Sequence, residues 1–377
     1  MLIDFLGLIS IFFYSIIIIV LSKNLINYKN SLLQINGTNN YLPFVSIVIA
    51  ARNEEQNINP LIKSLLKQSY PKNKFEVIII NDRSTDNTLK ILNQSKTLLS
   101  QLLILNIKTT PIGWAPKKWA LKFGIDQSSG EIILQTDADC RVPPKWIEKI
   151  VTQFSDKSVG FVAAPSPMGS NNSLIDKLFF LDSMAQDAIC ASGFLNNIAL
   201  TCSGRNISFR KAIYNHVDGY IGTESIPSGD DDLLMHKIYN LYKYKMIFLL
   251  SKDVVVLSDA PKTFKQFLLQ RMRFASKGLL YYKIDTNTVF RLILPLILIA
   301  NFFCFYFLID FLNNPTIYLL TLFIIKNLAD LYITYNYYYS IDQPFSFLSF
   351  TLLSLIYPIY IISFGIMGSI INVRWKN

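Results

Sequence analysis

Two aspartates follow an apolar stretch in the middle of the sequence. Residues 133–140 read ILQTDADC, so Asp137 and Asp139 are separated by one alanine and lie just beyond an apolar run that ends at Leu134. Carboxylates at the end of a buried strand are costly to desolvate unless a cation neutralises them. Mg²⁺ and Mn²⁺ prefer oxygen ligands, commonly one or two protein carboxylates completed by substrate phosphates. The pattern therefore predicts a site for a divalent metal and a diphosphate.

Several other kinds of site are excluded by the motifs that the sequence lacks. The loop after the first strand contains no glycine fingerprint for a dinucleotide, and no GxxxxGK[ST], HExxH or GxSxG motif occurs. The two histidines, His216 and His236, have no partner at a metal-ligand spacing, and the four cysteines form no CxxC pair. We expect reduced cysteines, no zinc and no nucleic-acid partner.

The elements around the aspartates alternate between strand and helix. The expected strands are Phe44–Ala50, Phe75–Ile80, Leu102–Ile107 and Glu131–Gln135, with helices from Ile58 to Leu66 and through Trp119 to Ile125. This alternation predicts a largely parallel sheet with helices on both faces. Ligands bind such sheets at the carboxyl ends of the strands, where Asp82, Asp137 and Asp139 fall.

The composition indicates a membrane protein. The chain of 377 residues has a mean hydropathy of +0.32, with 51% hydrophobic and only 16% charged residues. Leu2–Leu21 is expected to be an uncleaved anchor, and the expected C-terminal spans are Val289–Leu312, Thr316–Tyr339 and Phe345–Ile370. The middle span carries Lys326 and Asp330, whose spacing of four would let them pair on one helical face.

The charge of the chain is concentrated between the expected spans. Residues 23–288 hold 32 of the 36 Lys and Arg and 22 of the 26 Asp and Glu, which is the whole excess of +10. By the positive-inside tendency this places the middle domain in the cytoplasm. One anchor and three later spans would leave the C-terminus outside, although residues 372–377 are basic, so the count of C-terminal spans and their orientation stay open.

Five short motifs occur in a characteristic order. They are ARNEE (51–55), INDRSTDNT (80–88), TDADC (136–140), SGDDDLLMHKI (228–238) and QRMRF (270–274). Together with the terminal spans they resemble the membrane-bound members of glycosyltransferase family 2, over roughly residues 43–280. The resemblance implies an α/β fold of the nucleotide-sugar-binding GT-A type, with a mixed, mostly parallel sheet, one N-terminal transmembrane helix and about three C-terminal ones.

The resemblance also implies residues that bind the sugar donor. Asp82 matches the aspartate that hydrogen-bonds uracil, and Glu54 lies where the first-strand loop meets the nucleoside. Lys117 matches the lysine of the family's GK-x-x-A-L stretch. Asp137 and Asp139 match the Asp-x-Asp motif and would be the metal ligands for Mg²⁺ or Mn²⁺, with Asp139 the more direct one.

A second group of residues would serve the acceptor and the transfer. Asp230 and Asp231 align with the family's Glu-Asp pair, which makes Asp231 the general base and Asp230 an acceptor-side residue. Gln270 and Arg273 fit Gln-x-x-Arg-Trp, which closes over the diphosphate, with Phe274 in place of the tryptophan. Three adjacent carboxylates at 230–232 would also repel one another and favour a basic role.

Besides Phe274, three residues depart from the family pattern. Asp230 replaces a glutamate, Arg52 replaces an aromatic residue that often lies against uracil, and Pro116 replaces the glycine before the lysine.

Simpler explanations exist for each motif. Asp137 and Asp139 could cap a helix that begins after Pro143-Pro144, and Asp82 with Asp86 could form a turn with Ser84. The aspartates at 230–232 could only supply negative charge to a helix N-terminus. Residues 264–280 also have the pattern of a basic amphipathic helix at a membrane surface, which is compatible with a catalytic role for Gln270 and Arg273.

These inferences predict an integral membrane enzyme with an anchor (1–22), a cytoplasmic GT-A catalytic domain (43–260), an interfacial helix region (261–288) and a transmembrane region (289–371). It would transfer a sugar, with inversion, from a UDP-sugar to a lipid or lipid-linked acceptor at the cytoplasmic face of a bacterial plasma membrane. The rival functions are a processive polysaccharide synthase, a sugar-nucleotide pyrophosphorylase and a nucleotide-sugar-binding protein without transferase activity.

Overall fold

The computed structural model describes residues 2–32, 41–169, 173–241, 243–313, 315 and 317–370. Internal contacts divide the chain into two compact units. The α/β unit comprises residues 36–168 and 201–259, and the helical unit comprises 1–35, 169–200 and 260–373. The range expected for the catalytic domain, 43–260, therefore contains a segment that belongs to the helical unit. The basic residues at 372–377 lie outside the described residues.

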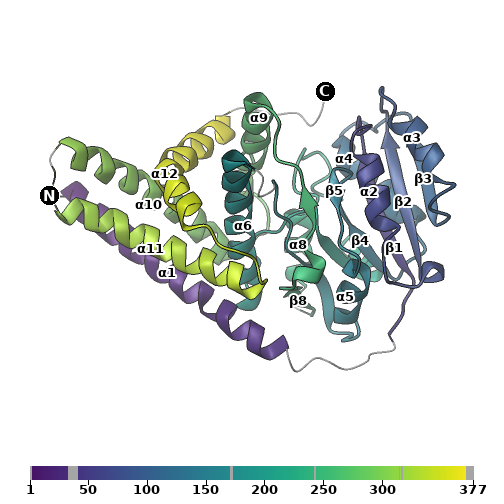
Figure 1. The fold of residues 1–377 in the computed structure, drawn as a ribbon, viewed down its shortest axis with the longest axis horizontal. Helices are drawn as coiled ribbons and strands as arrows, with labels where there is room; N and C mark the ends of the chain where they lie inside the picture. Colours follow the sequence, from purple (N-terminus) through teal and green to yellow (C-terminus); the bar gives the residue numbers. More distant parts are fainter. Residues whose placement is uncertain are drawn as a thin grey trace. The chain divides into compact units, whose positions relative to one another are not determined.

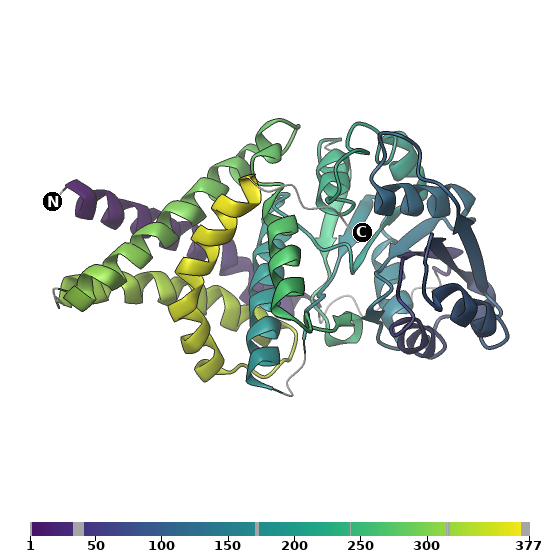
Figure 2. The ribbon, with the colours of Figure 1, turned by 90° about the horizontal axis from the view of Figure 1, so that it is seen from above.

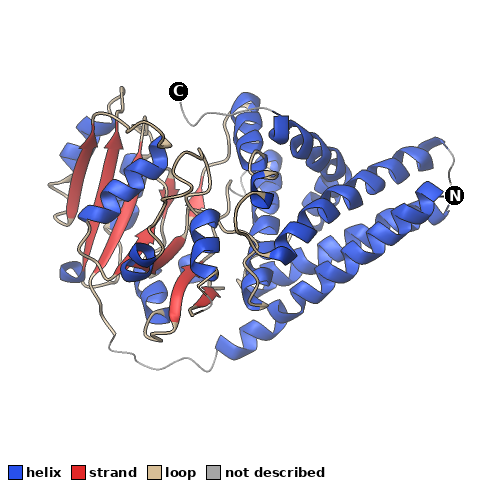
Figure 3. Ribbon diagram, turned by 180° about the vertical axis from the view of Figure 1, so that it is seen from behind, coloured by secondary structure: helices blue, strands red, loops and turns tan. Residues whose placement is uncertain are grey.

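A seven-stranded sheet forms the centre of the α/β unit (Figures 1 and 3). Its strands are β1 (Val45–Ala51), β2 (Phe75–Asp82), β3 (Leu102–Ile107), β4 (Ile132–Gln135), β6 (Val159–Ala163), β7 (Ile207–Arg210) and β8 (Lys245–Phe248), in the order β3-β2-β1-β4-β7-β6-β8. The pairs that β1 forms with β2 and β4 are parallel, as are β2–β3 and β6–β8, whereas β7 runs antiparallel to both neighbours. The expected mixed, mostly parallel sheet is confirmed.

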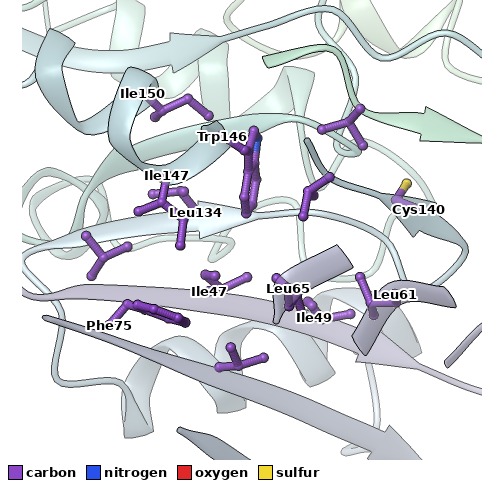
Figure 4. Close-up of a cluster of buried hydrophobic side chains, with 14 of the residues drawn as sticks. Ile47, Ile49, Leu61, Leu65, Phe75, Leu134, Cys140, Trp146, Ile147 and Ile150 are labelled. Atoms are coloured by element: carbon purple, nitrogen blue, oxygen red, sulfur yellow. The ribbon is translucent and has the colours of Figure 1, made fainter. Parts of the chain in front are cut away.

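Both faces of the sheet are covered, which explains why β1 is buried along its whole length. On one face, Ile47 and Ile49 pack with Leu61 of α2 (Ile58–Leu65) and Trp146 of α5 (Trp146–Gln153) (Figure 4). On the other face α4 (Pro116–Gln127) approaches so closely that a Cβ on Gly124 would clash with the Ile80 side chain. These helices fix the strands whose ends carry the predicted site.

Smaller elements complete the α/β unit. They are α3 (Thr88–Ser95), α7 (Lys211–His216), α8 (Asp232–Tyr239), two 3₁₀ turns (Lys72–Lys74 and Lys252–Val254) and an antiparallel pair of β5 (Cys140–Arg141) and β9 (Leu257–Ser258). The pairing of β5 with β9 ties the chain just after Asp139 to a segment more than a hundred residues later.

Long helices form the other unit (Figures 1 and 2). They are α1 (Leu2–Leu32), α6 (Leu174–Leu195), α9 (Phe264–Ala275), α10 (Thr288–Asn313), α11 (Ile317–Ser340) and α12 (Phe347–Ile370), with a 3₁₀ turn at Leu280–Tyr282. In the described part of the chain, four helices are long and apolar enough to cross a membrane, namely α1, α6, α10 and α12. The helix α11, which contains most of the expected span Thr316–Tyr339, is not among them. Sequence analysis did not anticipate α6, because its aspartates and lysine dilute its apolar character.

The helix α11 carries the ionisable pair that the sequence indicated. Lys326 Nζ lies 2.6 Å from Asp330 Oδ2, and the Tyr14 hydroxyl donates to Asp330 Oδ1 at 2.6 Å. The prediction that Lys326 and Asp330 pair is confirmed. Because the Lys326 side chain is fully buried and neutralised, the pair lowers the cost of placing α11 among apolar helices.

The helix α9 is shorter than the expected interfacial region of 261–288. Phe264 and Leu269 are exposed on it, which fits an amphipathic surface helix. Arg271 instead points inward and pairs with Asp182 of α6 at 2.7 Å, with the Phe267 and Phe274 rings within 6 Å of its guanidinium. This buried pair joins α9 to α6 within the helical unit.

Candidate active site

The loops that follow β1 and β2 are bonded to each other. The Glu54 amide donates to Thr88 Oγ1 at 2.7 Å, and the Thr85 amide donates to Asn53 Oδ1 at 2.9 Å. Asp86 accepts from the amides of Thr88 and Glu55, so it is this aspartate that forms the structural turn. The parallel pairing of β1 with β2 brings the predicted donor residue Glu54 to the same sheet edge as the end of β2.

Asp82 is the last residue of β2, and its side chain is fully buried. Arg83 donates to both of its oxygens, from Nε at 2.8 Å and from Nη2 at 3.2 Å. These bonds raise the pKa of Arg83. Arg83 has a φ of 52°, a left-handed conformation that costs free energy in a non-glycine residue. Asp82 is therefore a fixed carboxylate at the strand end rather than a turn residue.

Lys117 lies between two aspartates that are far apart in the sequence. Its Nζ is 2.8 Å from Asp137 Oδ1 and 2.9 Å from Asp230 Oδ2. Burial alone would lower the pKa of Lys117, but the charges of the two carboxylates outweigh it and raise the pKa above its usual value. The ammonium group is therefore held at the strand ends in its charged form.

Asp137 and Asp139 do not cap the next helix. The helix α5 begins at Trp146, its N-cap is Lys145, and no side chain caps it. Asp137 is bound to Lys117, and Asp139 Oδ1 accepts a weak bond from the Cys140 thiol at 3.7 Å.

The side chains of the three adjacent aspartates at 230–232 lie in different surroundings. Asp230 is buried and bound to Lys117, whereas Asp231 accepts from the Gly204 amide with Oδ2 and from the Asp232 amide with Oδ1, both at 2.8 Å. Asp231 is the N-cap of α8, and it is partly exposed to solvent. The repulsion expected among adjacent carboxylates is thus relieved by different donors.

Three residues of this site were missed by sequence analysis. Gln135 Nε2 donates to Asp230 Oδ2 at 3.0 Å, and the Tyr220 hydroxyl donates to Gln135 Oε1 at 3.1 Å. Gly204 lies against the aspartates, and a Cβ there would be 3.0 Å from Asp230 Oδ2. Gln135 ends an ordinary buried strand and Tyr220 is in a loop, so neither belongs to a pattern that the sequence displays.

The side chains at the strand ends supply two of the oxygen ligands that a hard divalent ion needs. Asp137 and Asp139 are oxygen ligands, but the described residues contain no group of three or more His, Cys, Asp or Glu side chains able to hold a metal. A site made of two carboxylates suits an ion completed by water and by the phosphate oxygens of a substrate. The residues therefore fit Mg²⁺ or Mn²⁺ bound together with a diphosphate.

The remaining predicted residues belong to the helical unit. Gln270, Arg273 and Phe274 lie on α9, where the Arg273 guanidinium is 5.6 Å from the Phe274 ring and Phe274 is 36% exposed. Their role at the diphosphate and the acceptor stays a prediction.

Sequence models of two related families match the chain. The model of Glycosyl transferase family 2 matches residues 46–216, and that of Glycosyl transferase family group 2 matches residues 132–366, which is more than half of the chain. The first range contains Lys117, Asp137 and Gly204, and the second also includes Asp230 and the helices that follow.

Known proteins resemble this chain in sequence and in fold. Glycosyltransferase AglE of Haloferax volcanii is 36% identical over 121 residues, which are 32% of this chain and 38% of that protein. Beta-monoglucosyldiacylglycerol synthase of Nostoc sp. is 39% identical over 121 residues, or 32% of this chain and 25% of that protein. The chain thus matches well under half of the length of either relative.

A solved structure extends the likeness to nearly the whole chain. The mannosyltransferase PcManGT from Pyrobaculum calidifontis, in complex with GDP-Man and Mn²⁺, has a TM-score of 0.56 at 17% identity and covers 95% of this chain and 97% of that one. This likeness confirms the expected fold class.

Proposed function

Because the chain belongs to glycosyl transferase family group 2, we propose that it transfers a sugar, with inversion, from a UDP-sugar to a lipid or lipid-linked acceptor at the cytoplasmic face of a membrane. The observation that carries the proposal is the ammonium of Lys117 between Asp137 and Asp230 at the carboxyl ends of parallel strands. A cation, an acidic pair and a buried carboxylate at one sheet edge suit a nucleoside diphosphate better than a neutral ligand.

The donor would be held by residues at the ends of β1, β2 and β4 and at the start of α4. Asp82 and Glu54 would contact the nucleoside, while Lys117 would neutralise part of the diphosphate charge. Asp137 and Asp139 would hold Mg²⁺ or Mn²⁺, which when bound neutralises phosphate charge in the ground state and in the transition state. Arg273 would add a positive charge from α9.

Transfer needs a base at the acceptor. Asp231 would take the proton of the acceptor hydroxyl while that oxygen forms a bond to the anomeric carbon and the bond from this carbon to the phosphate oxygen breaks. The nucleoside diphosphate leaves with the electron pair of the broken bond. Asp231 suits this role better than Asp230, because Asp230 is buried against Lys117 whereas Asp231 is partly exposed.

A lipid acceptor is supported by two observations. Among the described residues, four helices are long and apolar enough to cross a membrane. The similar protein from Nostoc sp. is named for synthesis of a glucosyldiacylglycerol. An enzyme anchored by such helices works where lipid acceptors are concentrated.

The test uses the full chain, purified and reconstituted in lipid vesicles. Radiolabelled UDP-glucose, UDP-galactose, UDP-N-acetylglucosamine and GDP-mannose are supplied in turn with Mn²⁺ or Mg²⁺, and label is measured in the organic phase. We expect labelled lipid from a UDP-sugar and none with a chelator. Asp139→Asn should lower the rate by about 10²-fold or more, because phosphate charge would be left uncompensated.

Asp126→Asn is the matched control, since Asp126 is an exposed partner of Lys122 at the far end of α4. It should transfer at the wild-type rate. Transfer that continues with chelator present, or a normal rate for Asp139→Asn, would contradict the metal-dependent mechanism. Label from GDP-mannose alone would contradict the choice of uridine.

A further inference from the structure

Two buried polar side chains lie behind Asp230. Gln135 is fully buried at the end of β4 and Tyr220 is 1% exposed. They form a chain of hydrogen bonds from the Tyr220 hydroxyl to the Gln135 amide and from this amide to Asp230. Buried polar groups are costly unless satisfied, so this chain needs a benefit that apolar side chains would not give.

The direction of the chain follows from chemistry. An ionised carboxylate can only accept hydrogen bonds, and Lys117 Nζ already contacts the Asp230 oxygen that faces Gln135. Gln135 must therefore present its amide nitrogen to Asp230 and its carbonyl oxygen to Tyr220. Burial raises the pKa of Tyr220 well above its usual value, so its hydroxyl keeps the proton that it donates.

Asp230 therefore has two donors with different properties. Lys117 is charged, partly exposed and also bound to Asp137, so it can be shared with phosphate oxygens. Gln135 is neutral and fully enclosed, and its orientation is fixed by Tyr220. Only the bond from Gln135 can stay unchanged when a diphosphate competes for Lys117.

The position of Asp230 determines that of its neighbour. Asp231 is bound to the Gly204 amide at 2.8 Å, and Gly204 lies close to Asp230 and Gln135, since a Cβ there would be 3.0 Å and 3.3 Å from them. A shift of Asp230 would therefore move Asp231.

We propose that Gln135 and Tyr220 are positioning residues that hold Asp230, and through it the base Asp231, in place while the donor engages Lys117. This inference rests on the proposed glycosyl transfer. It predicts that substitutions which break the hydrogen bonds from Tyr220 to Gln135 and from Gln135 to Asp230 lower kcat. The KM for the donor should stay nearly unchanged, because the donor contacts other residues.

The first experiment compares two tyrosines whose rings are 5.5 Å apart. Tyr220→Phe keeps the ring and removes the donor to Gln135, so kcat should fall about 10-fold with the KM for the nucleotide sugar within twofold of wild type. Tyr214→Phe removes a buried hydroxyl outside the chain of bonds to Asp230 and should leave both constants unchanged. Equal effects of the two substitutions would overturn the inference.

The second experiment exchanges the amide and the carboxylate. Gln135→Glu places a second carboxylate against Asp230 and should lower kcat by about 10²-fold or more. Adding Asp230→Asn lets an amide at position 230 donate to the carboxylate at position 135, and the pair then has the same total charge as in the wild type. The double variant should recover at least about 10-fold of the lost rate. Failure of the double variant to recover would show that Asp230 itself must be anionic and would overturn a purely positioning role for Gln135.

A third measurement does not require a known donor. In the wild type the Gly204 amide is bonded to Asp231, so its deuterium uptake should be slow. We expect faster uptake in the peptide containing Gly204 for Gln135→Glu, and wild-type uptake for the double variant and for Tyr214→Phe. If the wild type proves inactive with every nucleotide sugar, the proposed function fails, while this result still decides whether Gln135 positions the aspartates. Unchanged uptake in Gln135→Glu would overturn the inference.

Discussion

Replacing Lys117 by methionine tests the centre of the site. The substitution keeps a long apolar stem and removes the ammonium that lies between Asp137 and Asp230. Each carboxylate oxygen is less than 3 Å from that nitrogen, so the two oxygens are within about 6 Å of each other. Without Lys117 they face each other as like charges.

Lys117→Met leaves two carboxylates facing each other and breaks both ion pairs of Lys117. Two unit charges about 6 Å apart repel by about 3 kcal/mol at an effective dielectric constant of about 20. Removing one partner from a buried ion pair costs about 3–5 kcal/mol and from an exposed pair less than about 1 kcal/mol. The Lys117 and Asp230 side chains are 15% and 8% exposed, but Asp137 is 29% exposed. We therefore expect a loss of about 2–3 kcal/mol.

The assay is thermal unfolding of the full chain in detergent, with Lys122→Met as the control. Lys122 lies on the same helix and pairs with Asp126 at 2.6 Å, but this i,i+4 pair is exposed. At roughly 2–4 °C per kcal/mol, Lys117→Met should lower the Tm by about 4–12 °C. The control pair is worth about 0.3–0.5 kcal/mol, which is about 1–2 °C.

The pH dependence of this difference has a definite sign. The folded-state pKa of Lys117 is raised, so its stabilisation is complete below the ordinary lysine pKa of 10.5 and is lost only as pH rises through the raised value. The difference in Tm between wild type and Lys117→Met should therefore stay constant from about pH 7 to about pH 9. Equal melting of Lys117→Met and Lys122→Met would refute the reasoning, because it would show that the two aspartates do not depend on the lysine.

Three further outcomes are expected. Asp231→Asn should lower kcat by about 10²-fold with donor affinity nearly unchanged, measured by steady-state kinetics, and an equal loss in Asp232→Asn would indicate a shared electrostatic role. Arg271→Met should lower the Tm by more than the control Lys122→Met does, since it leaves Asp182 buried without its partner. Because phenylalanine offers a smaller face than tryptophan, Phe274 should permit only one or a few transfers per acceptor, and a product ladder of tens of sugars would contradict this.

The sequence predicts best those site residues that lie at the ends of strands. Asp82, Asp137 and Asp139 follow apolar runs, and in a parallel sheet those runs must end at one edge. The alternation of strand and helix was therefore enough to predict that these residues meet. The choice of Lys117 over Lys118 came from the family pattern alone.

The rest depended on contacts between distant segments that carry no periodic signal. Gln135 and Tyr220 are 85 residues apart. They meet because β4 pairs with β7, which is followed by α7 and then by the turn that carries Tyr220. The helix α6 was missed for a different reason. Its Asp182 and other charged residues interrupt the apolar run, and only the pairing with Arg271 shows how one of them is neutralised.

The two lysines at the start of α4 show how the site is assembled. Lys117 and Lys118 are consecutive, so the helical rotation of about 100° per residue points them in different directions. Lys117 binds Asp230, whereas Lys118 is buried and donates to the Thr223 carbonyl at 2.6 Å. Nearby, the Ala115 amide donates to the Glu224 carbonyl at 2.7 Å. The N-terminus of α4 thus contacts the segment from Thr223 to Asp230 at three positions.

This arrangement changes the basis for assigning the base. The adjacency of three carboxylates in the sequence predicts repulsion among them, but in the structure Asp230 is neutralised by Lys117 and Asp231 is bonded to two backbone amides. Repulsion within the cluster is therefore a weak reason for Asp231 to attract a proton. The stronger reason to assign the base to Asp231 is its accessibility. Contacts with α4 and Gln135 hold Asp230 in the interior, whereas its neighbour Asp231 is partly exposed. On this view the base is selected by which carboxylate the surrounding loops leave open to an acceptor hydroxyl.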